Sequence, residues 1–230
     1  IDFLTRKGFY VASESRANYT MTPESLASSL NMRYLDELTD NSKSSLGRRK
    51  RVTTILRDNA VLRLVKSLGY EYIHFDSGWA VTRRNGFADQ EPFRVKSYGN
   101  IFSDFSIQLY KSSMAQGIGL IFGYNADVQP AADRAELFKE SMRMLGTIPD
   151  KPQPTFVFNH NIPPHPPFMF DRAGSLRQDV TYEMKKNIWR EIELYVDQLI
   201  YVNETIESVV NEILERSPRE PVIIIQADHG

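Results

Sequence analysis

The sequence predicts an α/β fold, and three observations support that prediction. Short runs of β-branched and aromatic residues alternate with longer stretches in which apolar residues recur every three or four positions. The chain has 230 residues, of which 41% are apolar and 25% charged, the balance of a soluble globular domain. Polar and ionisable residues follow several of the predicted strands. We therefore expect one domain over residues 1–230, with a mostly parallel central sheet and helices on both faces.

In the first part of the chain, residues 8–12 (GFYVA) predict a strand. A helix is expected to open near Thr22, with this threonine as the N-cap and Pro23 at the first helical position. A second helix is predicted over 52–68, ended by Gly69, and a strand over 70–75 (YEYIHF).

Further along, a polar loop is expected from 79 to 98, followed by helices over 102–116 and 131–145. Residues 117–122 fit either a short strand or a continued buried element. The apolar runs 155–159 (TFVFN) and 221–226 (PVIIIQ) predict strands buried on both faces of the sheet, separated by a long amphipathic helix over about 179–216.

Charge and cysteine content exclude several classes of protein. Lysine and arginine number 28 against 29 aspartate and glutamate, so the net charge of -1 gives no field that would attract nucleic acid. Cysteine is absent, which excludes disulfides, thiolate metal sites and a cysteine nucleophile or cysteine-derived formylglycine within these residues. No stretch approaches the roughly 20 apolar residues that span a bilayer. We expect a soluble segment excised from a longer protein.

Four histidines are present, and three lie at or just beyond a predicted strand end: His160, His165 and His229. The pair Asp228-His229 offers a carboxylate and an imidazole where a strand runs out, which suits a divalent metal bound by oxygen and nitrogen. A plain turn closing the strand is the alternative. The fourth, His74, lies inside a strand and is interpreted as a satisfied structural histidine.

Two further residues are candidates for chemistry. His165 stands among four prolines, which would hold its imidazole on a stiff support for binding an anion or moving a proton. A surface loop, or a ligand for an aromatic groove, is the alternative. Thr22 opens a helix whose backbone N–H groups favour anions, so its hydroxyl could attack phosphorus or sulfur. Thr20 is the rival nucleophile, and an N-cap without chemistry remains the alternative.

Four segments, in this order, resemble a known family: FYVASESRANYTMTPESLASSLNMRYLD, GYEYIHFDSG, PTFVFNHNIPPHPPFMFD and PVIIIQADHG. Together they resemble the sulfatase-like hydrolases and transferases of the alkaline phosphatase superfamily, whose members include enzymes related to lipoteichoic acid synthase and phosphoethanolamine transferases. The resemblance implies an alkaline-phosphatase-like three-layer sandwich. It also implies attack by a side-chain nucleophile on a phosphate or sulfate ester, assisted by a metal, through a covalent intermediate.

By this resemblance Thr22 is the nucleophile and a metal ligand, and Ser25 is the small polar residue that follows three positions later. Asp228 and His229 match the terminal metal pair, with zinc, manganese, magnesium or calcium as the ion. His165, and less closely His160, matches the histidine that contacts the transferred group, so both are predicted to bind substrate, and His165 to assist catalysis.

The chain also departs from the family pattern. The C/S-x-P-x-R pattern that generates formylglycine is missing around Thr22, which favours a phosphate ester over a sulfate ester. An acidic metal ligand and a further histidine are expected outside the segment, so the segment alone is expected to be inactive or nearly so.

The expected substrate is an anionic ester. A lipid headgroup or an envelope polymer is one class of molecule that could carry it. Membrane anchoring is expected only through segments outside this chain, which would place the domain outside the cytoplasm. A true sulfatase or a phosphomutase of the same fold, and a degenerate domain that only binds, are the competing interpretations.

Overall fold

The computed structural model describes residues 1–37, 45–93, 109–110, 112–121, 129–177, 180 and 191–229. Within these ranges the chain forms seven α-helices, two short 3₁₀ helices and two strands. In chain order they are α1 (Asp2–Arg6), α2 (Thr22–Asn31), η1 (Leu35–Glu37), α3 (Ser45–Arg57), α4 (Ala60–Ser67), β1 (Glu71–His74), α6 (Ala115–Ile121), α7 (Gln129–Leu145), η3 (Ile148–Asp150), β2 (Thr155–Phe158) and α8 (Ile192–Arg216). Helices and a parallel sheet together confirm the α/β class.

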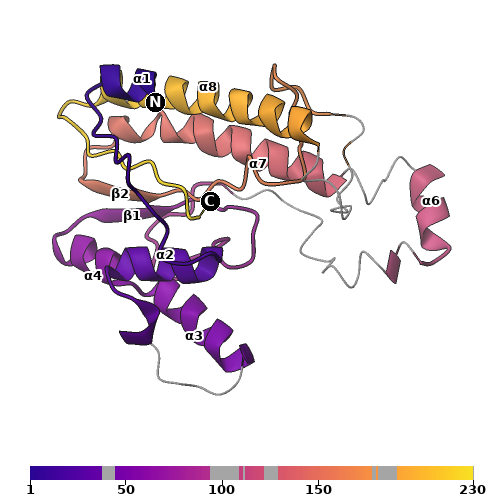
Figure 1. Ribbon diagram of the computed structural model, residues 1–230, viewed down its shortest axis with the longest axis horizontal. Coiled ribbons are helices and arrows are strands. Elements are labelled where there is room, and N and C mark those ends of the chain that lie inside the picture. Colours follow the sequence, from indigo (N-terminus) through magenta and orange to yellow (C-terminus); the bar gives the residue numbers. More distant parts are fainter. Residues whose placement is uncertain are drawn as a thin grey trace.

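The two strands pair in parallel, with Glu71 opposite Thr155 and His74 opposite Phe158. Their carboxyl ends therefore lie at the same edge of the sheet. Figure 1 shows α7 and α8 on one side of the strands and α2, α3 and α4 on the other, with the C-terminus beside the sheet and α2. Residues that follow β1 and β2 are thus brought toward the end of the chain.

Apolar side chains form a buried cluster on each side of the strands. One lies mainly between α7, α8 and the segment after β2, and comprises Ala131, Ala135, Phe138, Met142, Met169, Phe170, Val180, Val202 and Val209. The other joins α2, η1 and α3, and comprises Ala27, Leu35, Val52 and Leu56. Burial of these side chains fixes the helices against the sheet, because apolar area removed from water is the main stabilising contribution.

The strands predicted at 70–75 and 155–159 are confirmed as β1 and β2. Two other predicted strands are wrong. Residues 8–12 are irregular and Tyr10 is 92% exposed, while residues 221–226 run as an irregular segment with Val222 91% exposed. An apolar run becomes a strand only when a neighbouring backbone pairs with it, and in the described part of the chain neither run has such a neighbour.

The helix predicted over 52–68 is two helices, α3 and α4, separated at Asp58 and Asn59. The Asn59 side chain bonds both helices at this break: its oxygen accepts from Leu62 N at 2.8 Å, and its nitrogen donates to Leu56 O at 2.8 Å. Gly69, with φ +82, follows the end of α4 as predicted, since this backbone conformation strains other residues.

Residues 117–121 belong to helix α6, with Ile121 81% exposed, so both interpretations given for 117–122 were wrong where the structure describes them. The helix predicted over 131–145 is confirmed as α7, which begins two residues earlier. The helix predicted over 179–216 is confirmed from Ile192 onward as α8, and 181–190 lie outside the described residues, as does most of the helix predicted over 102–116. None of the helices described is both long and apolar enough to cross a bilayer.

Candidate active site

The end of the chain lies against the first turn of α2. The Thr22 Oγ1 is 3.2 Å from His229 Nε2, although 207 positions separate the two residues. The Ser25 hydroxyl donates to the backbone carbonyl of Asp228, and the Asp228 carboxylate is 3.3 Å from His229 Nε2. A hydroxyl, a carboxylate and an imidazole therefore converge at one place.

Thr22 is the first residue of α2 rather than its N-cap, which corrects the sequence prediction. The N-cap is Met21, whose backbone is extended with φ -116 and ψ 132, and Pro23 is the second residue of the helix. Helical torsions thus begin one residue earlier than predicted. The Thr22 hydroxyl consequently does not cap the helix, and it meets His229 at the end where backbone N–H groups favour negative charge.

His160 lies two residues beyond the end of β2, at the carboxyl edge of the sheet. Its Nδ1 is 2.8 Å from the Thr82 hydroxyl, which is itself 2.8 Å from the Ser77 hydroxyl after β1. Burial lowers the pKa of His160, while the charge of Asp228 acts in the opposite direction.

His165 is exposed, with Nδ1 2.7 Å from the Pro166 carbonyl. The proline loop that carries it is fixed by Gln198, which is fully buried in α8 and donates to the Pro164 carbonyl at 3.2 Å. Of the two histidines, it is His160 that lines a cavity at the sheet edge, together with Asp76 and Ser77. The predicted contact of either histidine with a substrate stays a prediction.

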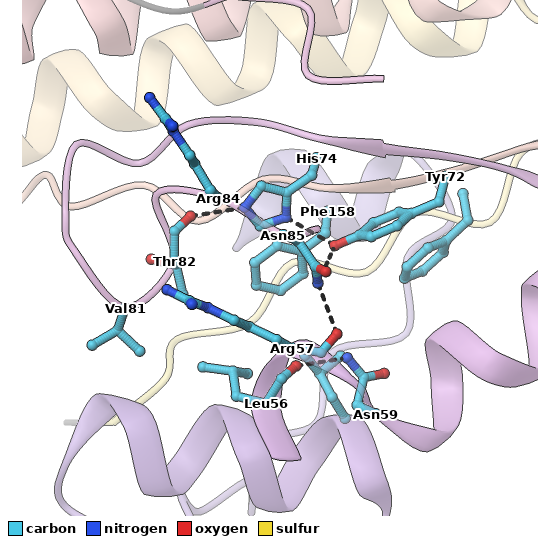
Figure 2. A pocket seen from close by; sticks show the side chains of 12 residues that line it. Leu56, Arg57, Asn59, Tyr72, His74, Val81, Thr82, Arg84, Asn85 and Phe158 are labelled. Carbon is cyan, nitrogen blue, oxygen red and sulfur yellow. Dashed lines mark hydrogen bonds between the residues drawn. The ribbon is translucent and has the colours of Figure 1, made fainter. Parts of the chain in front are cut away.

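The interpretation of His74 as a structural histidine is confirmed. Its side chain is 3% exposed, and both ring nitrogens are hydrogen-bonded: Nδ1 to the Tyr72 hydroxyl and Nε2 to the Thr82 carbonyl, each at 2.8 Å. Figure 2 shows these bonds, together with Asn85, which links Tyr72 to the backbone of Arg57. Burial lowers the pKa of His74, so the neutral ring is favoured.

Thr22 at the first turn of α2 fits part of a divalent metal site together with Asp228 and His229. Carboxylate oxygen, imidazole nitrogen and hydroxyl oxygen are donors that such ions accept, and Asp228, His229 and Thr22 supply one of each. Within the residues that the structure describes, no group of three histidine, aspartate or glutamate side chains is placed to hold a metal. The donors present are therefore a partial set, and their role as ligands stays a prediction.

Comparison with models of protein families shows to which family the chain belongs. The model of the family described as Sulfatase matches residues 2–230, nearly the whole chain. This chain belongs to the sulfatase family. The resemblance inferred from the four ordered segments is thereby confirmed, and the sulfatase domain is of the hydrolase or transferase type whose members generally use divalent metals. No curated protein and no solved structure matched the chain.

Sequence reasoning missed one residue, Thr82, that the structure places against His160. Thr82 lies in the loop after β1 and contacts His160, yet no motif surrounds it. Ser77 follows the strand predicted over 70–75, but its hydroxyl bond to Thr82 depends on how the loop folds back and could not be inferred from the sequence. Ser25 was identified by its spacing from Thr22, but its bond to the Asp228 carbonyl could not be inferred from that spacing.

Proposed function

We propose that this domain is a metal-dependent phosphoester hydrolase or phosphotransferase in which Thr22 is the nucleophile. The observation that supports this proposal is the approach of Thr22 Oγ1 to His229 Nε2 at 3.2 Å, at the N-terminus of α2. A hydroxyl beside a carboxylate and an imidazole is the arrangement that nucleophilic attack with metal assistance requires.

In this mechanism the Thr22 oxygen forms a bond to phosphorus while the bond from phosphorus to the leaving oxygen breaks. The hydroxyl proton passes to solvent, and the leaving oxygen takes up a proton. Water or an acceptor alcohol then attacks the phosphothreonine and restores Thr22. The backbone N–H groups of the first turn of α2 face the charge that develops on the transferred group.

Asp228 and His229, with Thr22, would hold the divalent ion, either zinc, manganese, magnesium or calcium. When bound, the ion would lower the pKa of the hydroxyl and offset negative charge on the ester. Ser25 holds the backbone of the turn that carries both ligands. His160 steadies the anionic ester, because it lines the cavity at the sheet edge, and His165 remains a second candidate for this contact and for protonation of the leaving oxygen.

A phosphate ester is the proposed substrate because the chain contains no cysteine and the residues around Thr22 lack the pattern that generates formylglycine. The family description favours a sulfate ester as the second candidate. We propose further that β1 and β2 belong to an alkaline-phosphatase-like three-layer sandwich. The domain is proposed to be anchored outside the cytoplasm through other segments. The ester is proposed to be carried by a lipid headgroup or an envelope polymer.

The test uses the full-length protein with p-nitrophenyl phosphate and p-nitrocatechol sulfate as probes, with each divalent ion supplied after treatment with a chelator. Thr22→Ala should reduce phosphatase turnover by at least about a thousandfold, because no nucleophile remains. Thr20→Ala is the matched control and should retain turnover. Intact mass should show one added phosphoryl group on the wild type and on Thr20→Ala, and none on Thr22→Ala.

Loss of turnover in Thr20→Ala but not in Thr22→Ala would move the nucleophile to Thr20. Hydrolysis of the sulfate probe with no hydrolysis of the phosphate probe would make the domain a sulfatase. Full turnover after chelation would contradict the metal dependence.

A further inference from the structure

Two buried chains of hydrogen bonds meet at Thr82, which is 2% exposed. One reaches its backbone carbonyl from β1, through Tyr72 and His74. The other reaches its hydroxyl through Ser77 and continues to His160. The Thr82 backbone is therefore held by buried His74, and its side chain by buried Ser77 and half-buried His160.

The direction of the first chain follows from the donors available. A carbonyl only accepts, so His74 Nε2 must carry the proton that it shares with the Thr82 carbonyl at 2.8 Å. In the neutral ring Nδ1 then accepts, so the Tyr72 hydroxyl donates to it at 2.8 Å. The Tyr72 oxygen in turn accepts from the Asn85 amide at 3.3 Å. Each hydrogen bond in this series thus has one donor and one acceptor, and together these bonds hold the loop that bears Thr82 against β1 (Figure 2).

The second chain begins at the Trp79 backbone N–H, which only donates and bonds the Ser77 oxygen at 3.1 Å. Ser77 has one proton, and two acceptors lie near it: the Thr82 oxygen at 2.8 Å and the Trp79 carbonyl at 3.4 Å. We take the Ser77 proton to lie in the shorter contact, so that Ser77 donates to Thr82. The opposite order, in which Thr82 donates to Ser77 and Ser77 donates to the Trp79 carbonyl, requires the proton on Nδ1 of His160, and the tautomer of His160 distinguishes the two. In the first order Thr82 donates its own proton to Nδ1 of His160, also at 2.8 Å.

We propose that Thr82 is a positioning residue of the candidate active site, which donates to Nδ1 of His160 and so holds this imidazole as the Nε2–H tautomer, a hydrogen-bond donor toward an anionic ester. The inference rests on the proposed function of the site. Burial lowers the pKa of His160, which favours the neutral ring that this arrangement requires. Thr82 itself does not touch the substrate.

The inference is tested first without activity, by the ¹⁵N and ¹H shifts of the His160 ring in the full-length protein. The wild type should show the Nε2–H tautomer. Thr82→Val keeps the shape but removes the hydroxyl, and should shift the ring toward a mixture of tautomers. Thr82→Ser should restore the wild-type pattern, and Thr147→Val, which changes an exposed threonine after α7, should leave it unchanged.

The second measurement separates KM from kcat with p-nitrophenyl phosphate. Thr82→Val should raise KM by about tenfold with little change in kcat, as expected when one hydrogen bond that orients a binding group is lost. A fold that is merely weakened would lower kcat per mole of protein and leave KM unchanged. Should Thr82→Val not fold, Ser77→Ala removes the donor behind Thr82 and should shift the tautomer in the same direction.

An unchanged tautomer in Thr82→Val would overturn the inference, whatever the activity. His160→Ala distinguishes this failure from that of the proposed function. Unchanged KM in His160→Ala would show that this histidine does not bind the ester. In that case Thr82 would position His160 without any effect on substrate binding.

Discussion

The Ser25 hydroxyl connects the first turn of α2 to the end of the chain. Its side chain is 1% exposed and donates to the Asp228 carbonyl. This bond holds the backbone immediately before His229, whose ring lies 3.2 Å from Thr22. One buried hydroxyl thus positions two proposed ligands without taking part in their chemistry.

Replacing Ser25 by alanine in the full-length protein should lower phosphatase turnover by about tenfold, because the turn is less well fixed. The free energy of unfolding should fall by about 1 kcal/mol, since a buried carbonyl loses its partner. Ser29→Ala on the same helix is the control, because that hydroxyl accepts only a long, exposed bond of 3.5 Å from Gln226. Equal turnover in the two variants would contradict the positioning role of Ser25.

At the scale of elements, the junction between α3 and α4 lies on the same side of the sheet as α2 (Figure 1). Asn59 is 3% exposed and bonds the end of α3 through Leu56 O and the start of α4 through Leu62 N. The Asn31 side chain of α2 also accepts from the Ala60 N–H at 3.1 Å. The junction therefore links α2, whose first residue is Thr22, to the helices behind it.

Asn59→Ala should reduce the free energy of unfolding by about 1–3 kcal/mol, because a helix cap is lost and buried backbone groups are left unpaired. Asn59→Asp keeps the acceptor for Leu62 N but loses the donor to Leu56 O, and should be intermediate. Urea denaturation followed by circular dichroism measures both. A change below about 0.5 kcal/mol in Asn59→Ala would mean that the helices hold their ends without this side chain.

For the whole molecule, buried histidines couple stability to pH. Burial lowers the pKa of His74 and of His160 below the usual value of 6.5. For His74 the hydrogen bond to Thr82 and the charges of Glu91 and Asp76 act in the opposite direction, and Arg57 acts with burial. The unfolded chain therefore binds these protons more readily than the folded one does. Stability is complete above the unfolded pKa and is lost as the pH falls through the folded pKa.

Acidification from about pH 7 to about pH 5 should therefore lower the free energy of unfolding. His74→Gln should be less stable at neutral pH, because the ring bonds to Tyr72 and Thr82 are lost, yet it should show a shallower decline over the same interval. Half-buried Asp76, whose pKa is raised by burial, opposes the decline in both proteins. Urea denaturation at each pH gives the two slopes, and equal slopes would exclude His74 as a contributor.

The sequence by itself determined the features that depend on neighbouring residues. Apolar runs located β1 and β2, the Thr-Pro-Glu sequence located the start of α2 to within one residue, and the order of four segments identified the family. Each is a local pattern or a sum of local patterns. The same local reasoning placed a strand at 221–226 and one continuous helix over 52–68, because it does not include partner backbones or the bonds of a side chain such as Asn59.

Only the tertiary structure decided which distant groups meet. It brought His229 to Thr22 across 207 positions and Thr82 to His160 across 78, and it left His165 exposed while His160 lines the cavity. Such contacts depend on how helices pack on the two sides of the sheet and on where each loop returns. Packing is a property of the whole chain, so no single segment of the sequence contains it.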